Sequence, residues 1–330
     1  CYINNFVQPA KPLAIEFPPG EGKRFKEDMD HLIEDLSIAI PSAFDGDEYR
    51  GRAEELQEGS KKREALELNK LREEASNEHV ALMETPTGYA FAPVDKEYEV
   101  INPEQFKKLS EEERQKIEKT VINLQERLQK LLKKFPTWRK ETRQKLKKLN
   151  HEVAKMAVEH SIADLKKKYD RREEIIRYLD EAQKDIIEHV RDFMPHREPS
   201  LPFIDLPADP NPFKRYQVNL ISDHGEKRTA PVVYEDHPNY ANLLGRIDHQ
   251  AHMGTLVTDF TMIKPGALHR ANGGYLILDA RKLLLQPYAW DCLKRILQSG
   301  EIRIESLETV SYTHLTLPTM RLRCRSRWSP

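Results

Sequence analysis

Residues Gly266 to Leu284 read GALHRANGGYLILDARKLL, and this stretch decides the fold. Two glycines precede the apolar run Tyr275 to Leu278, which ends in Asp279. The pattern predicts a short buried strand with a carboxylate at its C-terminal end. Ligands of open α/β sheets bind at the carboxyl ends of parallel strands, and in nucleoside triphosphatases such an aspartate helps to hold Mg²⁺. On its own, however, a capping Asp is the commoner explanation of this pattern.

The surrounding sequence favours a Mg²⁺ ligand over a capping Asp at this position. The block of Gly-Gly, apolar strand and Asp resembles the Walker B region of the AAA+ ATPases, and Leu293 to Ser306 resembles the helix and strand that follow it. Together with Asn239 to His249 (NYANLLGRIDH) and Thr258 to Ala280, the resemblance narrows to the Lon-related proteases. It is closest to the subgroup with a helical arm inserted in the ATPase domain. The resemblance covers about Cys1 to Leu307 and is strongest from Tyr234 onward.

The resemblance implies a Lon-like ATP-dependent serine endopeptidase that uses ATP and Mg²⁺, acts on protein substrates and assembles as a homo-oligomeric ring. Asp279 is the one residue carried over, as a ligand of the nucleotide-bound Mg²⁺. The sequence departs from the family at two positions: it has no GxxxxGK[ST] loop, and Ala280 stands where most AAA+ enzymes place the glutamate that orients water. The Ser–Lys peptidase dyad belongs to a further domain, so we expect no catalytic residue in this chain and no activity of the chain alone.

An arm is predicted before this core. Residues 117–135 carry apolar side chains at alternating steps of four and three, which is a coiled-coil seam, and Ser110 with Glu113 forms a capping box before it. A second seam starts at Leu146 and includes Met156. We expect two antiparallel helices with a bend near Phe135 to Trp138.

Two further elements are predicted on the N-terminal side of these helices, the first inside the arm and the second before it. The stretch VALMETPTGYAFAPV, at about 79–94, predicts a β-hairpin around Thr85 to Gly88. The helix with Phe25, Met29 and Leu32 on one face is expected to stop at Pro41.

The predicted fold class is therefore α/β: an incomplete AAA+ P-loop-type core, the Walker B half, with a long antiparallel coiled-coil arm and a small β-hairpin inserted. We divide the chain into a first core part (1–44), the arm (45–197), a second core part with Walker B (198–309), and a non-natural tail (310–330).

The tail is predicted to be a sequencing artefact. VSYTHLTLPT (310–319) and CRSRWSP (324–330) back-translate into nucleotides that match a transposase-type library adapter, with 320–323 where a sample index would fall. The tail holds four arginines and no acid, so without it the formal net charge changes from −1 to −5. The chain opens on Cys1 instead of Met, and we expect the natural start upstream.

The amino-acid composition limits the classes of function that the chain can have. The 330 residues include 32% charged and 38% hydrophobic ones, with no apolar run of the roughly 18 residues that a membrane span needs. Three dispersed cysteines form no CxxC, which suits a reducing compartment, so we expect a cytoplasmic protein without a membrane contact. A net charge near zero argues against a dedicated nucleic-acid binder.

Other candidate groups have simpler explanations. Asp248, His249 and His252 resemble metal ligands, but we expect surface histidines and no metal site. We expect His269 and Arg270 either to face a nucleotide or a neighbouring subunit, or to serve in packing, and do not count them as site residues. The basic run Lys130 to Lys148 is either a solvated helix face, which we favour, or a surface for nucleic acid or an acidic partner.

Two alternatives to the ATP-dependent protease stay open. Ala280 raises a degenerate AAA+ module that shapes a Lon-like protease without hydrolysis. The other alternative is a coiled-coil AAA+ ATPase that binds nucleic acid or protein without proteolysis.

Overall fold

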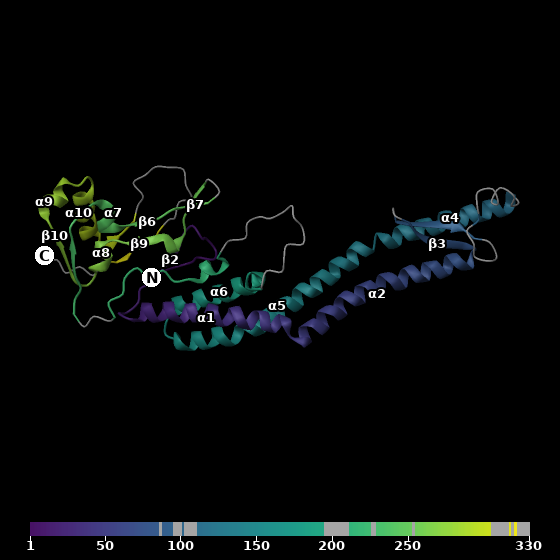
Figure 1. The fold of residues 1–330 in the computed structure, drawn as a ribbon, viewed down its shortest axis with the longest axis horizontal. Coiled ribbons are helices and arrows are strands. Elements are labelled where there is room, and N and C mark those ends of the chain that lie inside the picture. Colours follow the sequence, from purple (N-terminus) through teal and green to yellow (C-terminus); the bar gives the residue numbers. More distant parts are fainter. Residues whose placement is uncertain are drawn as a thin grey trace. The chain divides into compact units, whose positions relative to one another are not determined.

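The computed structural model describes residues 1–85, 88–94, 101, 111–194, 211–225, 229–252, 255–304, 317 and 320–321. These residues form helices and short strands that pair two by two (Figure 1). The chain divides into two compact units: unit 1 comprises Cys1–Pro41 and Lys155–Pro330, and unit 2 comprises Ser42–Ala154. In the described part of the chain, no helix is both long and apolar enough to cross a membrane.

Unit 2 is a helical pair that carries a hairpin. Helix α2 (Asp47–Asn77) leads into strands β3 (Val80–Thr85) and β4 (Gly88–Pro93), which pair antiparallel with Thr85 opposite Gly88. Helix α4 (Glu111–Leu132) and the first part of α5 (Phe135–Lys168) follow. The predicted capping box lies outside the described residues. One core joins α2, the hairpin, α4 and α5: Leu71, Ala75, Val80, Leu82, Leu124, Leu128, Leu131, Phe135 and Trp138.

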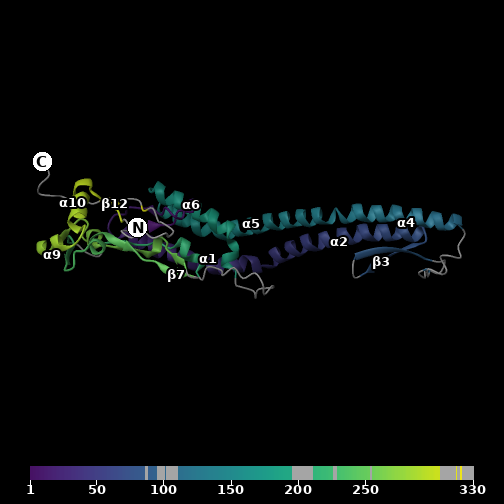
Figure 2. The same cartoon turned by 90° about the horizontal axis from the view of Figure 1, so that it is seen from above.

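The predicted bend near Phe135 to Trp138 is wrong. Helices α4 and α5 follow one another in the same direction, and α2 is their antiparallel partner (Figure 2). The ion pairs that fix this alignment are Arg127–Glu74 (2.8 Å), Arg139–Glu64 (2.8 Å) and Arg52–Glu152 (3.5 Å). As the chain advances along α4 and α5, its partner on α2 moves steadily back toward the N-terminus.

The reason is the position of Pro136. It lies in the first turn of α5, where the amide hydrogen it lacks would have no helical acceptor. Phe135 and Trp138 therefore continue the apolar seam of α4 instead of turning away from it. The chain reverses between α2 and α4, on the side of the hairpin.

Pro41 does not end the first helix either. Helix α1 (Glu21–Asp45) continues through Pro41 and ends before Gly46, whose backbone is extended. An internal proline removes one helical hydrogen bond and bends the helix, and this cost does not have to end it. Pro41 is also the last residue of the first segment of unit 1.

In unit 1 the second seam shifts to a different face of α5. Ala154, at the boundary of the units, Val158 and Ile162 are fully buried, whereas Met156, expected in the seam, is 76% exposed. Below this point α5 has other neighbours: Lys168 pairs with Asp28 of α1, and Lys166 pairs with Asp180 of α6 (Glu173–Glu188). A helix with new neighbours buries a new face, so the heptad pattern of unit 2 does not extend into unit 1.

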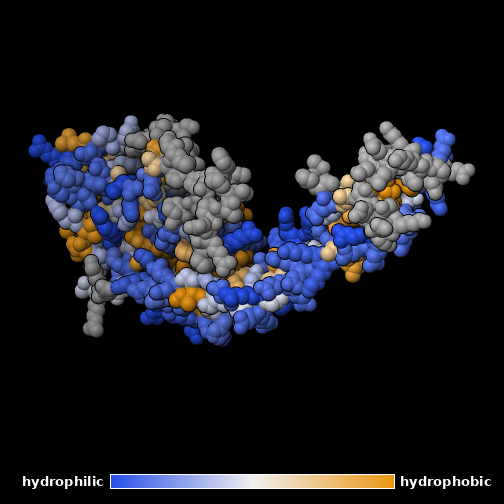
Figure 3. Space-filling model, turned by 45° about the vertical axis from the view of Figure 1, so that its right-hand side comes forward, coloured by the Kyte–Doolittle hydropathy of each residue, from blue (hydrophilic) through white to orange (hydrophobic). Residues whose placement is uncertain are grey.

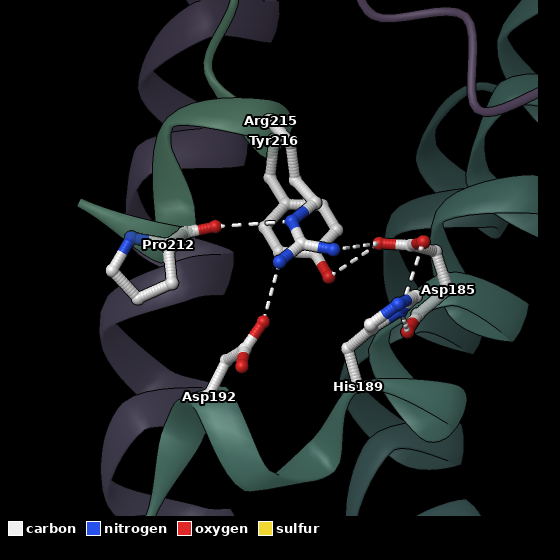
Figure 4. A network of polar contacts seen from close by, with 6 residues as sticks. All are labelled: Asp185, His189, Asp192, Pro212, Arg215 and Tyr216. Atoms are coloured by element: carbon white, nitrogen blue, oxygen red, sulfur yellow. Dashed lines mark hydrogen bonds and ion pairs between the residues drawn. The ribbon is translucent and has the colours of Figure 1, made fainter. Parts of the chain in front are cut away.

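The chain that returns after residue 210 is tied to α6 by a polar network (Figure 4). The Arg215 guanidinium, in η2 (Pro212–Tyr216), pairs with Asp185 and with Asp192 of η1 (Val190–Phe193). The Tyr216 hydroxyl donates to Asp185 Oδ2 at 2.7 Å. The Asp185 carboxylate thus serves two partners on the returning chain.

The rest of unit 1 consists of short elements. The sheets pair β1 (Tyr2–Ile3) with β2 (Leu13–Ala14), β5 (Val232–Glu235) with β10 (Tyr275–Leu278), β6 (Gly245–Ile247) with β9 (Ile263–Pro265), β7 (Gln250–His252) with β8 (Thr255–Val257), and β11 (Glu301–Ile302) with β12 (Met320–Arg321). The helices are α7 (Tyr240–Leu244), η3 (Phe260–Met262), α8 (Ala267–Arg270), α9 (Ala280–Leu285) and α10 (Ala289–Ser299). Strand β12 lies in the segment predicted to be adapter-derived.

Candidate nucleotide site at the carboxyl edge of β5 and β10

Strands β5 and β10 form a parallel pair, as an α/β core requires. Tyr275 lies opposite Val232 and Leu278 opposite Glu235, so both strands end at the same edge. Three carboxylates follow at or just after this edge: Glu235, Asp236 and Asp279. The predicted strand therefore forms, and it brings Asp279 next to two acids that sequence reasoning did not single out. The sequence contains a signal for Glu235 and Asp236, because they end the run VVYED (232–236), in which the apolar residues of β5 come first.

The strand pair is covered on one face only, so the expectation of a fully buried strand is wrong. Leu276 and Leu278 pack on the core of α7, α9 and α10. On the other face Val232, Tyr234, Tyr275 and Ile277 are between 48% and 67% exposed, and orange apolar residues are visible on the surface of unit 1 (Figure 3). A short apolar run cannot distinguish one covered face from two.

The glycine pair before β10 has a geometric role. Gly273 has a φ of +77°, which favours glycine, and it faces open space. A Cβ atom on Gly274 would lie 2.0 Å from the carbonyl oxygen of Pro231. That oxygen accepts a 2.7 Å hydrogen bond from the amide of Tyr275. The two glycines thus let the chain turn and then approach β5 closely enough to pair.

Asp279 is the N-cap of α9. Its Oδ1 accepts a 3.1 Å hydrogen bond from the amide of Lys282, and Ala280 is the first helical residue. Side-chain acceptors at this position satisfy an otherwise unpaired helical amide. The side chain is exposed, and Ala280 adds no carboxylate beside it. Asp279 therefore has a structural role as the N-cap of α9.

The neighbouring acids are neutralised within the chain. The Lys282 ammonium pairs with Asp236, and this hydrogen bond lowers the pKa of Asp236 and raises that of Lys282. Arg270 pairs with Glu235 at 3.1 Å. Two cations from α8 and α9 thus pair with the acids at the end of β5 and just after it.

This arrangement does not make a complete Mg²⁺–nucleotide site. Mg²⁺ in such sites takes one or two carboxylates, several waters and the phosphates of the substrate. Among the described residues no three His, Cys, Asp or Glu side chains gather closely enough to hold a metal. The edge offers the Asp279 carboxylate as one ligand, with no phosphate-cradling loop in the sequence. We therefore derive no chemical step through Mg²⁺ or ATP.

The other candidate groups have structural partners. Asp248 pairs with Arg246 at 2.8 Å and forms no metal cluster with its described neighbours. His269 is 3% exposed, and its Nδ1 accepts a 3.3 Å hydrogen bond from the Gly266 amide, so it belongs to the packed interior. Burial lowers the pKa of His269 to about 4.

Two segments match known protein families. Residues 228–324 match the model of a LonB-like AAA domain, and residues 1–32 match the model of a Lon-like LonC helical domain. The first match extends into the segment 310–330, whose artificial origin stays a prediction. No curated protein matches the chain. The two matched segments lie in the same compact unit, and together they support a relation of the chain to the Lon-related proteases.

Proposed function

We propose that the chain forms the AAA-type ATPase module of a Lon-like serine endopeptidase. The observation that carries this proposal is the parallel pair β5–β10 with Asp279 at its carboxyl edge, inside the segment similar to a LonB-like AAA domain. Such a module prepares protein substrates and delivers them to a peptidase domain. Asp279 is the residue proposed to face the Mg²⁺ of a bound ATP.

Within this function we favour a module that does not hydrolyse ATP. Asp279 already caps α9, Ala280 supplies no carboxylate to orient a water, and Lys282 holds Asp236. Phosphoryl transfer depends on a positioned water and on charge stabilisation around the phosphates. The described edge provides one carboxylate for phosphoryl transfer. This supports a module that shapes or gates the peptidase chamber over a module that is driven by ATP hydrolysis.

The remaining parts of the proposal come from the family. Copies of the module are proposed to assemble into a ring around a peptidase chamber and to act in the cytoplasm. The free thiols of Cys1 and Cys292 are compatible with a reducing compartment. The chain alone is proposed to be inactive.

The deciding experiment uses the complete gene product. ATP turnover and casein cleavage are measured together, with and without Mg·ATP. Cleavage at the same rate without ATP, and no turnover above the buffer baseline, is expected for the non-hydrolysing module. Turnover that cleavage requires would support the ATP-driven form instead.

A coiled-coil ATPase without proteolysis is tested by the gene sequence beyond residue 309. A downstream domain with a Ser–Lys pair is expected. Absence of that domain, together with no casein cleavage, would reject the protease proposal altogether.

A further inference from the structure

Asp236 and Asp279 are the residues that directly follow β5 and β10. The register of this parallel pair places Glu235 opposite Leu278. Its continuation brings Asp236 opposite Asp279. Paired positions of neighbouring strands lie about 5 Å apart, so the two carboxylates share one end of the sheet. Two like charges at this spacing repel each other unless a cation lies with them.

Lys282 contacts both of these acids. Its amide donates to Asp279 Oδ1 at 3.1 Å, and its ammonium donates to Asp236 Oδ1 at 2.5 Å. The pKa of Lys282 is raised, first by the hydrogen bond to Asp236, and the Asp279 carboxylate adds to this effect. Asp236 has two further neighbours, the Tyr234 hydroxyl at 3.4 Å and the His237 ring at 3.5 Å. Lys282 therefore brings an ammonium group to this pair of acids.

Asp236 is an acid that a metal ion could reach. Its side chain is 51% exposed, whereas that of Glu235 is 14% exposed. Glu235 is also held twice, by the Arg270 guanidinium at 3.1 Å and by the His237 amide at 3.2 Å. Mg²⁺ in nucleotide sites takes one or two carboxylates together with waters and phosphates. Asp236 beside Asp279 would complete such a pair if its ammonium partner were absent.

We propose that Lys282 sets the metal affinity of this edge, because its ammonium keeps Asp236 from serving as a second cation ligand beside Asp279. The nucleotide-bound cation then meets one carboxylate instead of two. Lys282 is thus a specificity-determining residue that acts through Asp236. This role of Lys282 rests on the proposed function of Asp279, and it gives the incomplete Mg²⁺ site at this edge a physical cause.

Charge repulsion sets the size of the effect. A divalent cation bound to Asp236 would lie about 4 Å from the Lys282 ammonium, and at that distance the repulsion lowers metal affinity by about tenfold even in water with about 0.1 M salt. The ion pair itself is exposed, and exposed pairs contribute little to folding stability. Removing the ammonium should therefore change metal binding and leave the fold intact.

The test is Mn²⁺ binding to the complete gene product without nucleotide, followed by the electron paramagnetic resonance signal of free Mn²⁺. Mn²⁺ prefers the same oxygen ligands as Mg²⁺. Lys282→Met removes the ammonium and keeps a long side chain, and it is expected to bind Mn²⁺ about tenfold more tightly than the unchanged protein. The gain should disappear when Lys282→Met is combined with Asp236→Asn, and also when it is combined with Asp279→Asn.

The matched control is Lys294→Met on α10. It also breaks an exposed ion pair of a lysine, with Asp291 at 2.7 Å, and it makes the same charge change in the same unit. We expect no change in Mn²⁺ affinity. Lys282→Arg, which keeps a cation beside Asp236, is expected to bind Mn²⁺ like the unchanged protein. Urea unfolding without metal establishes that each variant is folded, and Lys282→Gln replaces Lys282→Met if the latter is not.

Three results would overturn the proposal: Mn²⁺ binding that is no tighter in Lys282→Met, an equal gain in Lys294→Met, or a gain that persists when Asp236 is replaced. An equal gain in the control would mean that binding follows total charge. The proposed function fails separately, because it requires the unchanged protein to bind Mg·ATP. A calorimetric titration with Mg·ATP measures that binding independently of the Mn²⁺ result.

Discussion

Tyr2 and Asn219 exchange two backbone hydrogen bonds, each 2.9 Å long, although 216 residues separate them in the chain. The Asn219 side chain continues this link, because its Nδ2 donates to the carbonyls of Phe260 (2.7 Å) and Ile263 (2.9 Å). Asn219 thus joins the segment similar to a LonC helical domain to the segment similar to a LonB-like AAA domain.

Replacing Asn219 with Ala should leave the Phe260 and Ile263 carbonyls without this donor and destabilise unit 1 by about 2 kcal/mol. Hydrogen exchange followed by mass spectrometry should show faster exchange in residues 1–15 and 211–225 and unchanged exchange in α2. Asn69→Ala, at an exposed position of α2, is the control. Equal protection in Asn219→Ala and the unchanged protein would mean that the side chain adds nothing to the junction.

Asp223 caps α1 from a distant part of the chain. Burial raises the pKa of Asp223, but backbone amides outweigh this effect, and the pKa lies below its ordinary value. The amides belong to Gly20, Gly225, His224 and Lys23. Asp223→Ala is expected to destabilise the protein at neutral pH by about 1 kcal/mol, whereas Asp223→Asn, which keeps an acceptor, should lose less.

The stabilisation by Asp223 should decrease as the pH is lowered. A carboxyl with a lowered folded pKa stabilises the fold fully above its unfolded pKa, about 3.9, and this contribution is lost as the pH falls through the folded pKa. Urea titrations at pH 7 and near pH 3 should therefore show the difference between Asp223 and Ala shrinking at the lower pH. A difference that is constant with pH would contradict the role of the ionised cap.

Local patterns were readable from the sequence, and long-range neighbours were not. The TPTG turn predicted the β3–β4 hairpin, and the 4–3 spacing predicted the buried Leu124, Leu128 and Leu131, because both depend on adjacent residues. The bend at Phe135 failed because a proline's effect depends on its position in the helix. Met156 failed because the neighbours of α5 change along its length.

At the candidate site, too, the sequence predicted the local pattern but not the long-range partners. The parallel strand and Asp279 at its end were found from an apolar run and its last residue. Lys282 and Arg270 were not recognised as partners of Asp236 and Glu235, because those pairs join residues 46 and 35 positions apart. Only the fold brings such charges together.

The Gly-Gly pair offers a comparison within one motif. Gly274→Ala would place a Cβ 2.0 Å from the Pro231 oxygen, so β5 and β10 would have to separate, at a cost of about 3 kcal/mol or more. Gly273→Ala meets only the strain of a positive φ and should cost about 1 kcal/mol. Urea unfolding of the two variants should give this order. A larger loss for Gly273→Ala would refute the close approach of Gly274 to β5.

His269 should make the fold sensitive to acid. Its folded pKa is about 4, because burial disfavours the charged ring, while an unfolded histidine titrates near 6.5. Between these values the unfolded chain takes up the proton and the folded chain does not, so stability falls as the pH decreases. The expected loss is up to about 3 kcal/mol between pH 7 and pH 4.

The variant His269→Gln removes this titration and should show a flatter stability profile across that range. His31→Gln, at an exposed side chain of α1, is the matched control and should keep the original slope. Urea midpoints at several pH values measure both. An unchanged slope in His269→Gln would assign the acid sensitivity to other groups.

Asp279 can be tested for its two roles separately. Asparagine keeps an oxygen that accepts the hydrogen bond from the Lys282 amide, but it carries no charge for a cation. Alanine removes both. If Asp279 acts as a helix cap alone, Asp279→Asn should match the unchanged protein in stability and in nucleotide binding, and Asp279→Ala should lose about 1 kcal/mol of stability.

If the carboxylate also holds a nucleotide-bound cation, Asp279→Asn should bind Mg·ATP more weakly at unchanged stability. Thermal unfolding and calorimetric titration with Mg·ATP, both on the complete gene product, separate these outcomes. We expect the second outcome, because Asp279 lies at the carboxyl edge of β5 and β10, where ligands of parallel sheets bind. An Asp279→Asn variant that binds Mg·ATP as tightly as the unchanged protein would instead reject the proposed contact with Mg²⁺ and leave Asp279 as a helix cap alone.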